Sequence, residues 1–158
     1  MRYSRGFSLI ELMVTISILA ILIAIAVPSF TSAIRDSRID SLSRELQGAL
    51  QLARSEAVKR RVNVVVCRRN AAGTACENGT DWGSGWLVQQ AGGDVIKVWD
   101  SVQGMAITGP NAGVTFRNNG MVTATGNFGV TQSSCTGQQK RTLAVSATGT
   151  TTLAKVNC

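Results

Sequence analysis

The sequence predicts an α+β fold in which one long N-terminal helix packs against a small antiparallel β-domain. Three observations lead to this prediction. The chain begins with a continuous apolar run, and the following segment repeats apolar residues at three- and four-residue spacings. The remainder consists of short runs rich in valine and threonine between glycine turns, with no second helical period. A chain of 158 residues, less this stem, is long enough for one compact domain.

The N-terminal apolar run is long enough to cross a membrane. No residue in the range 12–30 is charged, and at ~1.5 Å per helical residue this stretch is about as long as a bilayer core is thick. Arg2 and Arg5 precede the run, and the positive-inside rule places these cations on the cytoplasmic side. We therefore expect a single-pass inner-membrane protein whose C-terminal domain lies in the periplasm of a two-membrane bacterium.

A glycine directly before the apolar run distinguishes it from a secretory signal peptide, which would carry its small-residue cleavage site after a shorter apolar core. Here Gly6 precedes Phe7, and Glu11 follows four residues later. This pattern resembles the type IV pilin and pseudopilin superfamily. The resemblance implies cleavage after Gly6 by a prepilin peptidase, methylation of the new amine of Phe7, and retention of the helix as anchor and polymerisation stem.

The resemblance also divides the chain into functional segments. Residues 1–6 form the leader peptide, residues 7–30 the transmembrane and polymerisation helix, and residues 31–158 the periplasmic head domain of a pilin fold. The head includes an amphipathic helix at about 32–60.

Glu11 is an acidic residue within an apolar helix. A carboxylate near the centre of a lipid-exposed helix costs roughly 2.5 to 3.5 kcal/mol even on lenient insertion scales, so a compensating partner is expected. The resemblance implies that this partner is the free amine of Phe7 on a neighbouring subunit, a charge pair formed as subunits enter a filament. The alternative is an interfacial carboxylate that tilts towards the headgroups or pairs with the amine of its own chain one turn away.

Four cysteines and no histidine indicate an oxidising compartment. Three connectivities are open in principle. Spacing favours a disulfide between Cys67 and Cys76, which closes a glycine-containing loop, and another between Cys135 and Cys158, which ties down the chain terminus. A zinc site is the competing interpretation, but the sequence has no Cys-x-x-Cys pair and no histidine. We therefore expect no metal and no cofactor.

The second half of the predicted helix carries one apolar stripe, which we expect to face a sheet. Two acid–base pairs four residues apart, Asp40 with Arg44 and Glu56 with Arg60, mark its solvated face. The stripe consists of Ile39, Leu42, Leu46, Ala49, Leu50, Ala53 and Ala57.

Short β-branched and apolar runs with intervening turns predict the strands of an antiparallel domain. A hairpin with a turn at Gly92 and Gly93 joins two of them. The predicted strands cover residues 62–66, 86–89, 95–99, 105–108, 114–117, 121–123, 128–131, 143–146 and 153–156.

Segments 52–60 and 82–87 and the turn at Gly149 resemble the FimT/FimU and GspH group of minor pilins. The resemblance implies two packed sheets beside the helix and a filament component made in small amounts. It implies a minor pilin that primes assembly of a type IV pilus or forms its tip, serving twitching motility and adhesion. Expected partners are the major pilin and other minor pilins, the prepilin peptidase, the inner-membrane assembly platform and, before assembly, membrane lipid. The runner-up is the minor pseudopilin of a type II secretion system.

An enzyme and a DNA-binding protein are the other classes considered. The sequence has no histidine, no Walker or dinucleotide-type glycine loop and no convincing carboxylate pair, so we expect no catalysis. A net charge of +7 permits binding to anionic surfaces. Some FimT-group members bind DNA through a Gly-Arg-x-Arg motif, but the corresponding turn here, at Gly149, lacks both arginines. The candidate DNA contacts are Lys59, Arg60, Arg61, Arg68, Arg69, Lys140, Arg141 and Lys155.

Overall fold

The computed structural model describes residues 7–100 and 102–158. The predicted leader, including Gly6, lies outside the described residues. The chain divides into two compact units, Met1–Asp36 and Ser37–Cys158. A single helix, α1 (Leu9–Arg60), contributes to both units and includes both predicted helical segments.

The N-terminus of α1 is set by a side-chain cap. Ser8 precedes the first helical residue, and its Oγ accepts a hydrogen bond of 3.3 Å from the backbone N–H of Glu11. A serine followed three residues later by glutamate is the capping-box pattern, in which side chains satisfy amides that have no partner within the helix. At the other end, Arg61 adopts a left-handed φ of 59°, a backbone conformation that stops a helix.

In the second unit, the predicted apolar stripe of α1 is buried. All seven of its residues are at most 4% exposed. Ser43 shares this buried face, and its Oγ donates a hydrogen bond of 2.7 Å to the carbonyl of Ile39, which satisfies the hydroxyl without a partner from another element. The three- and four-residue periodicity therefore identified the face of α1 that supports the sheets.

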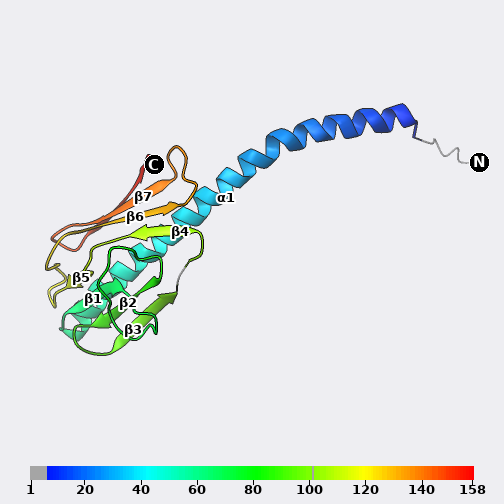
Figure 1. Ribbon diagram of the computed structural model, residues 1–158. Helices are drawn as coiled ribbons and strands as arrows, with labels where there is room; N and C mark the ends of the chain where they lie inside the picture. Colours follow the sequence, from blue (N-terminus) through cyan, green and yellow to red (C-terminus); the bar gives the residue numbers. More distant parts are fainter. Residues whose placement is uncertain (1–6, 101) are drawn as a thin grey trace, which may run out of the picture. The chain divides into compact units, whose positions relative to one another are not determined.

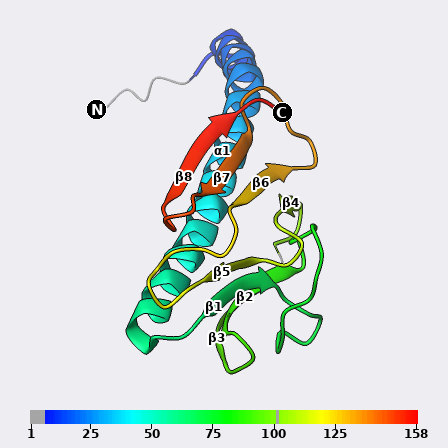
Figure 2. The same ribbon diagram turned by 90° about the vertical axis from the view of Figure 1, so that its left-hand side faces the viewer.

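Two four-stranded antiparallel sheets pack with residues 37–60 of α1 (Figures 1 and 2). The first has the order β3-β2-β1-β5 and the second the order β4-β6-β7-β8. The first comprises β1 (Val64–Arg68), β2 (Gly85–Gln90), β3 (Val95–Asp100) and β5 (Val114–Phe116). The second comprises β4 (Met105–Thr108), β6 (Gly126–Gln132), β7 (Lys140–Val145) and β8 (Thr151–Val156). The predicted α+β fold with two sheets beside one helix is confirmed.

One hydrophobic core joins the helix to both sheets, and its largest fully buried side chains are aromatic. Trp82, from the loop before β2, meets Phe128 of β6 edge to face, with ring centroids 5.0 Å apart. The indole N–H of Trp82 is shared between the carbonyl oxygens of Gly79 and Pro110, at 3.2 and 3.3 Å. Trp82 thus fills the core while its one polar atom stays hydrogen-bonded.

Three strands of the second sheet, β6, β7 and β8, begin two or three residues earlier than predicted. Two other predicted strands differ in another way. The first begins at Val64, two residues later than predicted, because the left-handed conformation of Arg61 turns the chain after the helix. Residues 121–123 form no strand, and only an isolated bridge joins Val122 to Phe116. A tight turn at Gly120, with φ of 78°, returns this segment to the edge of β5. The two segments then lie side by side over too few residues to form a regular β-ladder.

Candidate assembly site and basic surface

The N-terminal assembly motif begins at the edge of the described chain. The Phe7 side chain is 71% exposed, and Glu11 is exposed on the first turn of α1. Within residues 7–100 and 102–158, no cation forms an ion pair with Glu11. The hydrogen bond that its backbone N–H donates to Ser8 holds the residue on the first turn of the helix.

The apolar part of α1 in the first unit is exposed at each position whose side chain the structure describes. Its large apolar side chains from Phe7 to Phe30 are between 50% and 77% exposed. An 18-residue window of α1 has a mean hydropathy of 2.7, and none of it is buried. Exposed apolar surface on this scale requires an apolar environment, which lipid or a bundle of similar helices can provide.

Both predicted disulfides are present. Cys67 on β1 is bonded to Cys76, with Cα atoms 5.5 Å apart, and Cys135 is bonded to the terminal Cys158, with Cα atoms 5.9 Å apart. The first bond holds the loop between β1 and β2 against the outer face of the first sheet. There Val65 and Leu87 form a second small core with the disulfide. Both faces of β1 and β2 are therefore covered, which explains their continuous apolar sequences.

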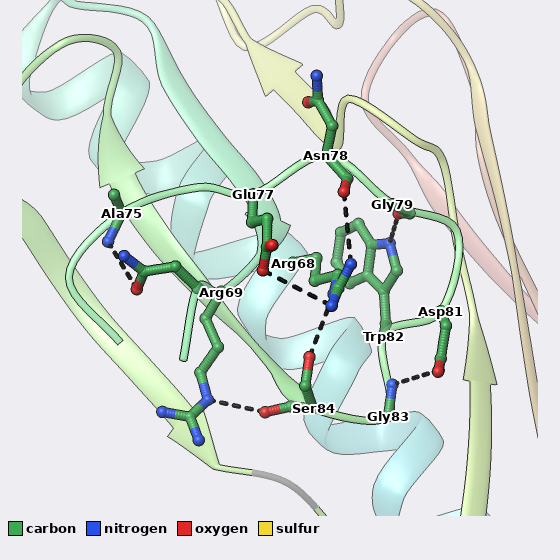
Figure 3. A network of polar contacts seen from close by, with 11 residues as sticks. Arg68, Arg69, Ala75, Glu77, Asn78, Gly79, Asp81, Trp82, Gly83 and Ser84 are labelled. Atoms are coloured by element: carbon green, nitrogen blue, oxygen red, sulfur yellow. Dashed lines mark hydrogen bonds and ion pairs between the residues drawn. The ribbon is translucent and has the colours of Figure 1, made fainter. Parts of the chain in front are cut away.

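Arg68 and Arg69, two of the predicted DNA contacts, hold this loop together (Figure 3). The guanidinium of Arg68 donates a hydrogen bond to the Ser84 hydroxyl at 3.2 Å and lies 3.6 Å from the Glu77 carboxylate. Arg69 donates to the Ser84 carbonyl at 2.7 Å and pairs with Asp100 at 3.4 Å. These arginines cross-link the loop to the ends of β2 and β3, which accounts for their charges without a nucleic acid.

The basic cluster at the end of α1 is partly neutralised. Lys59 lies 3.9 Å from the Glu56 carboxylate, and Arg60 forms a hydrogen-bonded ion pair with the same group. The hydrogen bond from Arg60 is the largest influence that lowers the pKa of Glu56 below its ordinary value. Arg61 is exposed beyond the last helical turn. Cations near a helix C-terminus also complement the exposed carbonyls.

Arg141 lies in the interior, contrary to its predicted place on an exposed basic surface. It is 3% exposed, and its Nε donates to Asp40 Oδ1 at 2.5 Å. This hydrogen bond, ahead of the Coulombic attraction of the same guanidinium, lowers the pKa of Asp40 below its ordinary value. The positive charge of Lys155 also favours the ionised carboxylate. Asp40 is hydrogen-bonded to Arg141 rather than to Arg44, the partner predicted from spacing.

Sequence reasoning missed a groove that combines α1 with the turn between β7 and β8. The groove has a volume of about 570 Å³, and Arg54 is half-buried in it beside Gly149. Two turns pack back to back at this point, because a Cβ on Gly149 would meet the carbonyl oxygen of Gly120. The groove is lined by Gln51, Arg54, Ser55, Val58, Lys59, Gly149 and Thr151.

Comparisons with known proteins agree with these features. Residues 1–27 match the family model described as a prokaryotic N-terminal methylation motif, and residues 42–149 match the model described as type II transport protein GspH. The type IV minor pilin FimU of Pseudomonas aeruginosa strain PAO1 is similar in two crystal structures. One, in space group P21, has a TM-score of 0.60 at 23% identity, over 75% of this chain and 89% of FimU. The other, in space group P65, has a TM-score of 0.58 at 26% identity, over 73% and 91%. No curated protein sequence matches the chain significantly.

A methylation motif, an exposed apolar helix and a two-sheet head define a subunit of the type IV pilin class. The apolar helix and the motif fit a membrane-anchored pilin, and membership of this class implies assembly with other pilins and the pilus machinery. The chain belongs to the GspH family, as a type IV minor pilin of the FimT/FimU/GspH type. The family consists of structural subunits.

Proposed function

We propose that this chain is a minor pilin that primes assembly of a type IV pilus or forms part of its tip. The observation that carries the proposal is the exposed apolar stem with an acid, Glu11, that forms no ion pair among the described residues, joined to a head with the fold of the FimU minor pilin. Before assembly the stem spans the inner membrane once and the head lies in the periplasm. In the assembled filament the head is extracellular.

The mechanism is burial. A prepilin peptidase cleaves after Gly6, and the new amine of Phe7 is methylated. On the inner-membrane platform, the apolar stem then moves from lipid into a bundle of pilin helices. Glu11 pairs with the Phe7 amine of a neighbouring subunit and sets its register. The contact is head-to-tail, because a closed two-fold pair would stop growth.

Deletion of the gene tests this function. Surface pili are counted by electron microscopy in strains with and without the retraction motor. For a priming subunit, pili vanish in the first strain and return in the second, because slow assembly becomes visible once retraction stops. Normal pilus numbers in both strains would contradict the proposal.

Substitution of Glu11 by alanine tests the mechanism. We expect membrane insertion and leader cleavage to be unchanged, because the apolar stem and Gly6 are retained, and incorporation into sheared filaments to fall at least about tenfold. That ratio corresponds to ~1.4 kcal/mol, a modest cost for leaving the Phe7 amine of the neighbouring subunit without its carboxylate partner in an apolar environment. Immunoblots of membrane and filament fractions report both quantities. Efficient incorporation of Glu11→Ala would refute the assembly role, and exposed Glu45→Gln on the same helix is the control.

A second candidate is the minor pseudopilin of a type II secretion system. The matching family model, whose description names type II transport, favours it. Processing and assembly would be the same, so the two functions differ in phenotype. A deletion that abolishes secretion of periplasmic proteins while leaving pili intact would support the secretion role.

DNA binding receives less support from the arrangement of charges. Of the eight proposed contacts, Lys59, Arg60, Arg68, Arg69 and Arg141 form ion pairs within the chain. Phosphate binding would release counterions and weaken steeply with salt. We expect a duplex titration to show no saturable binding at low salt, and strong salt-dependent binding would restore the DNA-receptor hypothesis.

A further inference from the structure

Each of the two sheets has one edge strand that is covered by another segment of the chain. The edge of β4 is covered by the loop before β2, because the backbone N–H of Trp82 donates to the Ile107 carbonyl at 2.8 Å. The edge of β5 is covered by the segment after Gly120, where the Thr123 N–H donates to the Thr115 carbonyl at 3.0 Å. Paired backbone groups of this kind leave no template for another strand.

The two remaining edges belong to β3 and β8. A register shift between Val88 and Gln89 interrupts the pairing of β2 with β3, and β3 itself carries Lys97 and Asp100. Irregular pairing and charged residues both discourage strand addition. In contrast, β8 is regular over six residues and has one charged residue, Lys155. Among the described residues, only β7 forms backbone hydrogen bonds with β8.

The pairing pattern shows which backbone groups of β8 face outward. The Ser146 N–H donates to the Thr150 carbonyl at 3.0 Å, which makes these residues the first hydrogen-bonded pair of the β7–β8 hairpin. Hydrogen-bonded and non-hydrogen-bonded pairs alternate along an antiparallel ladder. The amides and carbonyls of Thr151, Leu153 and Lys155 therefore point away from β7, towards the open edge.

The groove that contains Arg54 begins at the same edge. Thr151, the first residue of β8, lines this groove and accepts a hydrogen bond of 3.1 Å from the Gln47 side chain of α1. Val58, which is 49% exposed, supplies an apolar surface on the helix side. An extended chain added to β8 at Thr151 would continue into the groove.

Arg54 gives the groove its charge preference. The side chain is half-buried, and no described residue accepts a hydrogen bond from it or forms an ion pair with it. Lys59, at 78% side-chain exposure, lines the same groove. A half-buried guanidinium without an acceptor favours a carboxylate, which can bind it through two hydrogen bonds.

We propose that an extended, acidic segment of a neighbouring pilin subunit adds as a strand to the outer edge of β8, with one of its carboxylates on Arg54. Backbone bonds to Thr151, Leu153 and Lys155 supply the affinity, and Arg54 with Val58 selects the side chains. The proposal rests on the proposed function, since the partner is another subunit of the same filament. It assigns the contact between heads to this edge.

The test uses the full-length chain in cells, with a photo-crosslinking residue in place of exposed Ala154. Lys155→Pro removes one outward N–H, which an edge strand tolerates, and Lys155→Thr is its matched control because it removes the same side chain and keeps the amide. Arg54→Ala is compared with exposed Arg44→Ala on the same helix. Tryptophan fluorescence confirms that all four heads remain folded.

We expect the wild-type crosslink to join Ala154 to an acidic segment of a chain with a pilin methylation motif. Its yield should fall at least about tenfold in Lys155→Pro and Arg54→Ala and stay unchanged in both controls. Equal yields in all variants would overturn the proposal. The proposal would also be overturned if no pilin crosslink formed and the chain bound duplex DNA with an affinity that fell in Arg54→Ala but not in Lys155→Pro. If the wild-type gene restores pili to the deletion strain while the crosslink is absent, this contact is wrong and the proposed function stands.

Discussion

The ion pair between Asp40 and Arg141 makes the most specific prediction for stability. Asp40→Asn removes the charge of the acceptor, while Arg141 keeps its hydrogen bonds to the carbonyls of Gln138 at 2.9 Å and Lys140 at 3.3 Å. A hydrogen bond to a charged group contributes about 1.5 to 3 kcal/mol. The Asp40 side chain is 44% exposed and the Arg141 side chain 4%, so solvent screening reduces this figure. We expect a loss of about 1 to 2 kcal/mol, or a midpoint lowered by about 3 to 8 °C.

Tryptophan fluorescence during thermal unfolding of the full chain in detergent measures this change. All three tryptophans lie in the head, so the fluorescence signal does not report on the apolar N-terminal helix. The pKa of Asp40 is below its ordinary value of 3.8. The stabilisation is therefore present at neutral pH and is lost as the pH falls below 3.8 and through the folded-state pKa. The unfolding midpoints of the wild type and of Asp40→Asn should therefore become equal in acid. Equal midpoints at pH 7, or a shift as large in the exposed control Glu45→Gln, would refute the reasoning.

Three further substitutions test other parts of the head by the same measurement. Replacing Cys67 and Cys76 by serine should lower the free energy of unfolding by about 2 to 4 kcal/mol and expose the small core behind β1. An unchanged thermal midpoint would show that the loop is held in place without the disulfide. Gly149→Ala should lower the free energy of unfolding by about 2 kcal/mol or more, because φ is 77° and the new Cβ meets a backbone carbonyl. Gly137→Ala is the control, with φ of 59° and open space, and should lower it by about 1 kcal/mol. Equal losses in the two variants would contradict this account. Trp82→Phe should lower the free energy of unfolding by about 1 to 3 kcal/mol, because the Gly79 carbonyl loses its indole donor, while the Pro110 carbonyl keeps the Gly113 N–H. A neutral result would mean that the Gly79 carbonyl finds another partner.

Local patterns predicted the helical part of this protein well. The apolar residues of α1 recur on one face from Ile39 to Ala57, and every one of them is buried, because helix geometry alone fixes which side chains share a face. The pair of Glu56 with Arg60 is confirmed for the same reason. Cysteine spacing also favoured the two disulfides that form, since both close short segments of chain.

Prediction was weaker where partners come from distant parts of the sequence. Asp40 and Arg141 are 101 residues apart, and their contact depends on how β7 crosses the helix. Residues 121–123 have the composition of a strand, yet they meet β5 at a single bridge. In both cases the residue types were compatible with several partners, and chain geometry selected one.

By itself, the sequence determined the apolar N-terminal helix, its methylation motif, the buried face of the helix and the family. These properties depend on residues that are neighbours along the chain or one helical turn apart. The tertiary structure decided which arginines are neutralised, that the disulfide loop covers the outer face of the first sheet, and that β8 is left as an open edge beside Arg54. Each of these features depends on how distant segments pack together. That packing must bury the apolar surface and pair the buried backbone hydrogen-bonding groups of the whole domain at the same time.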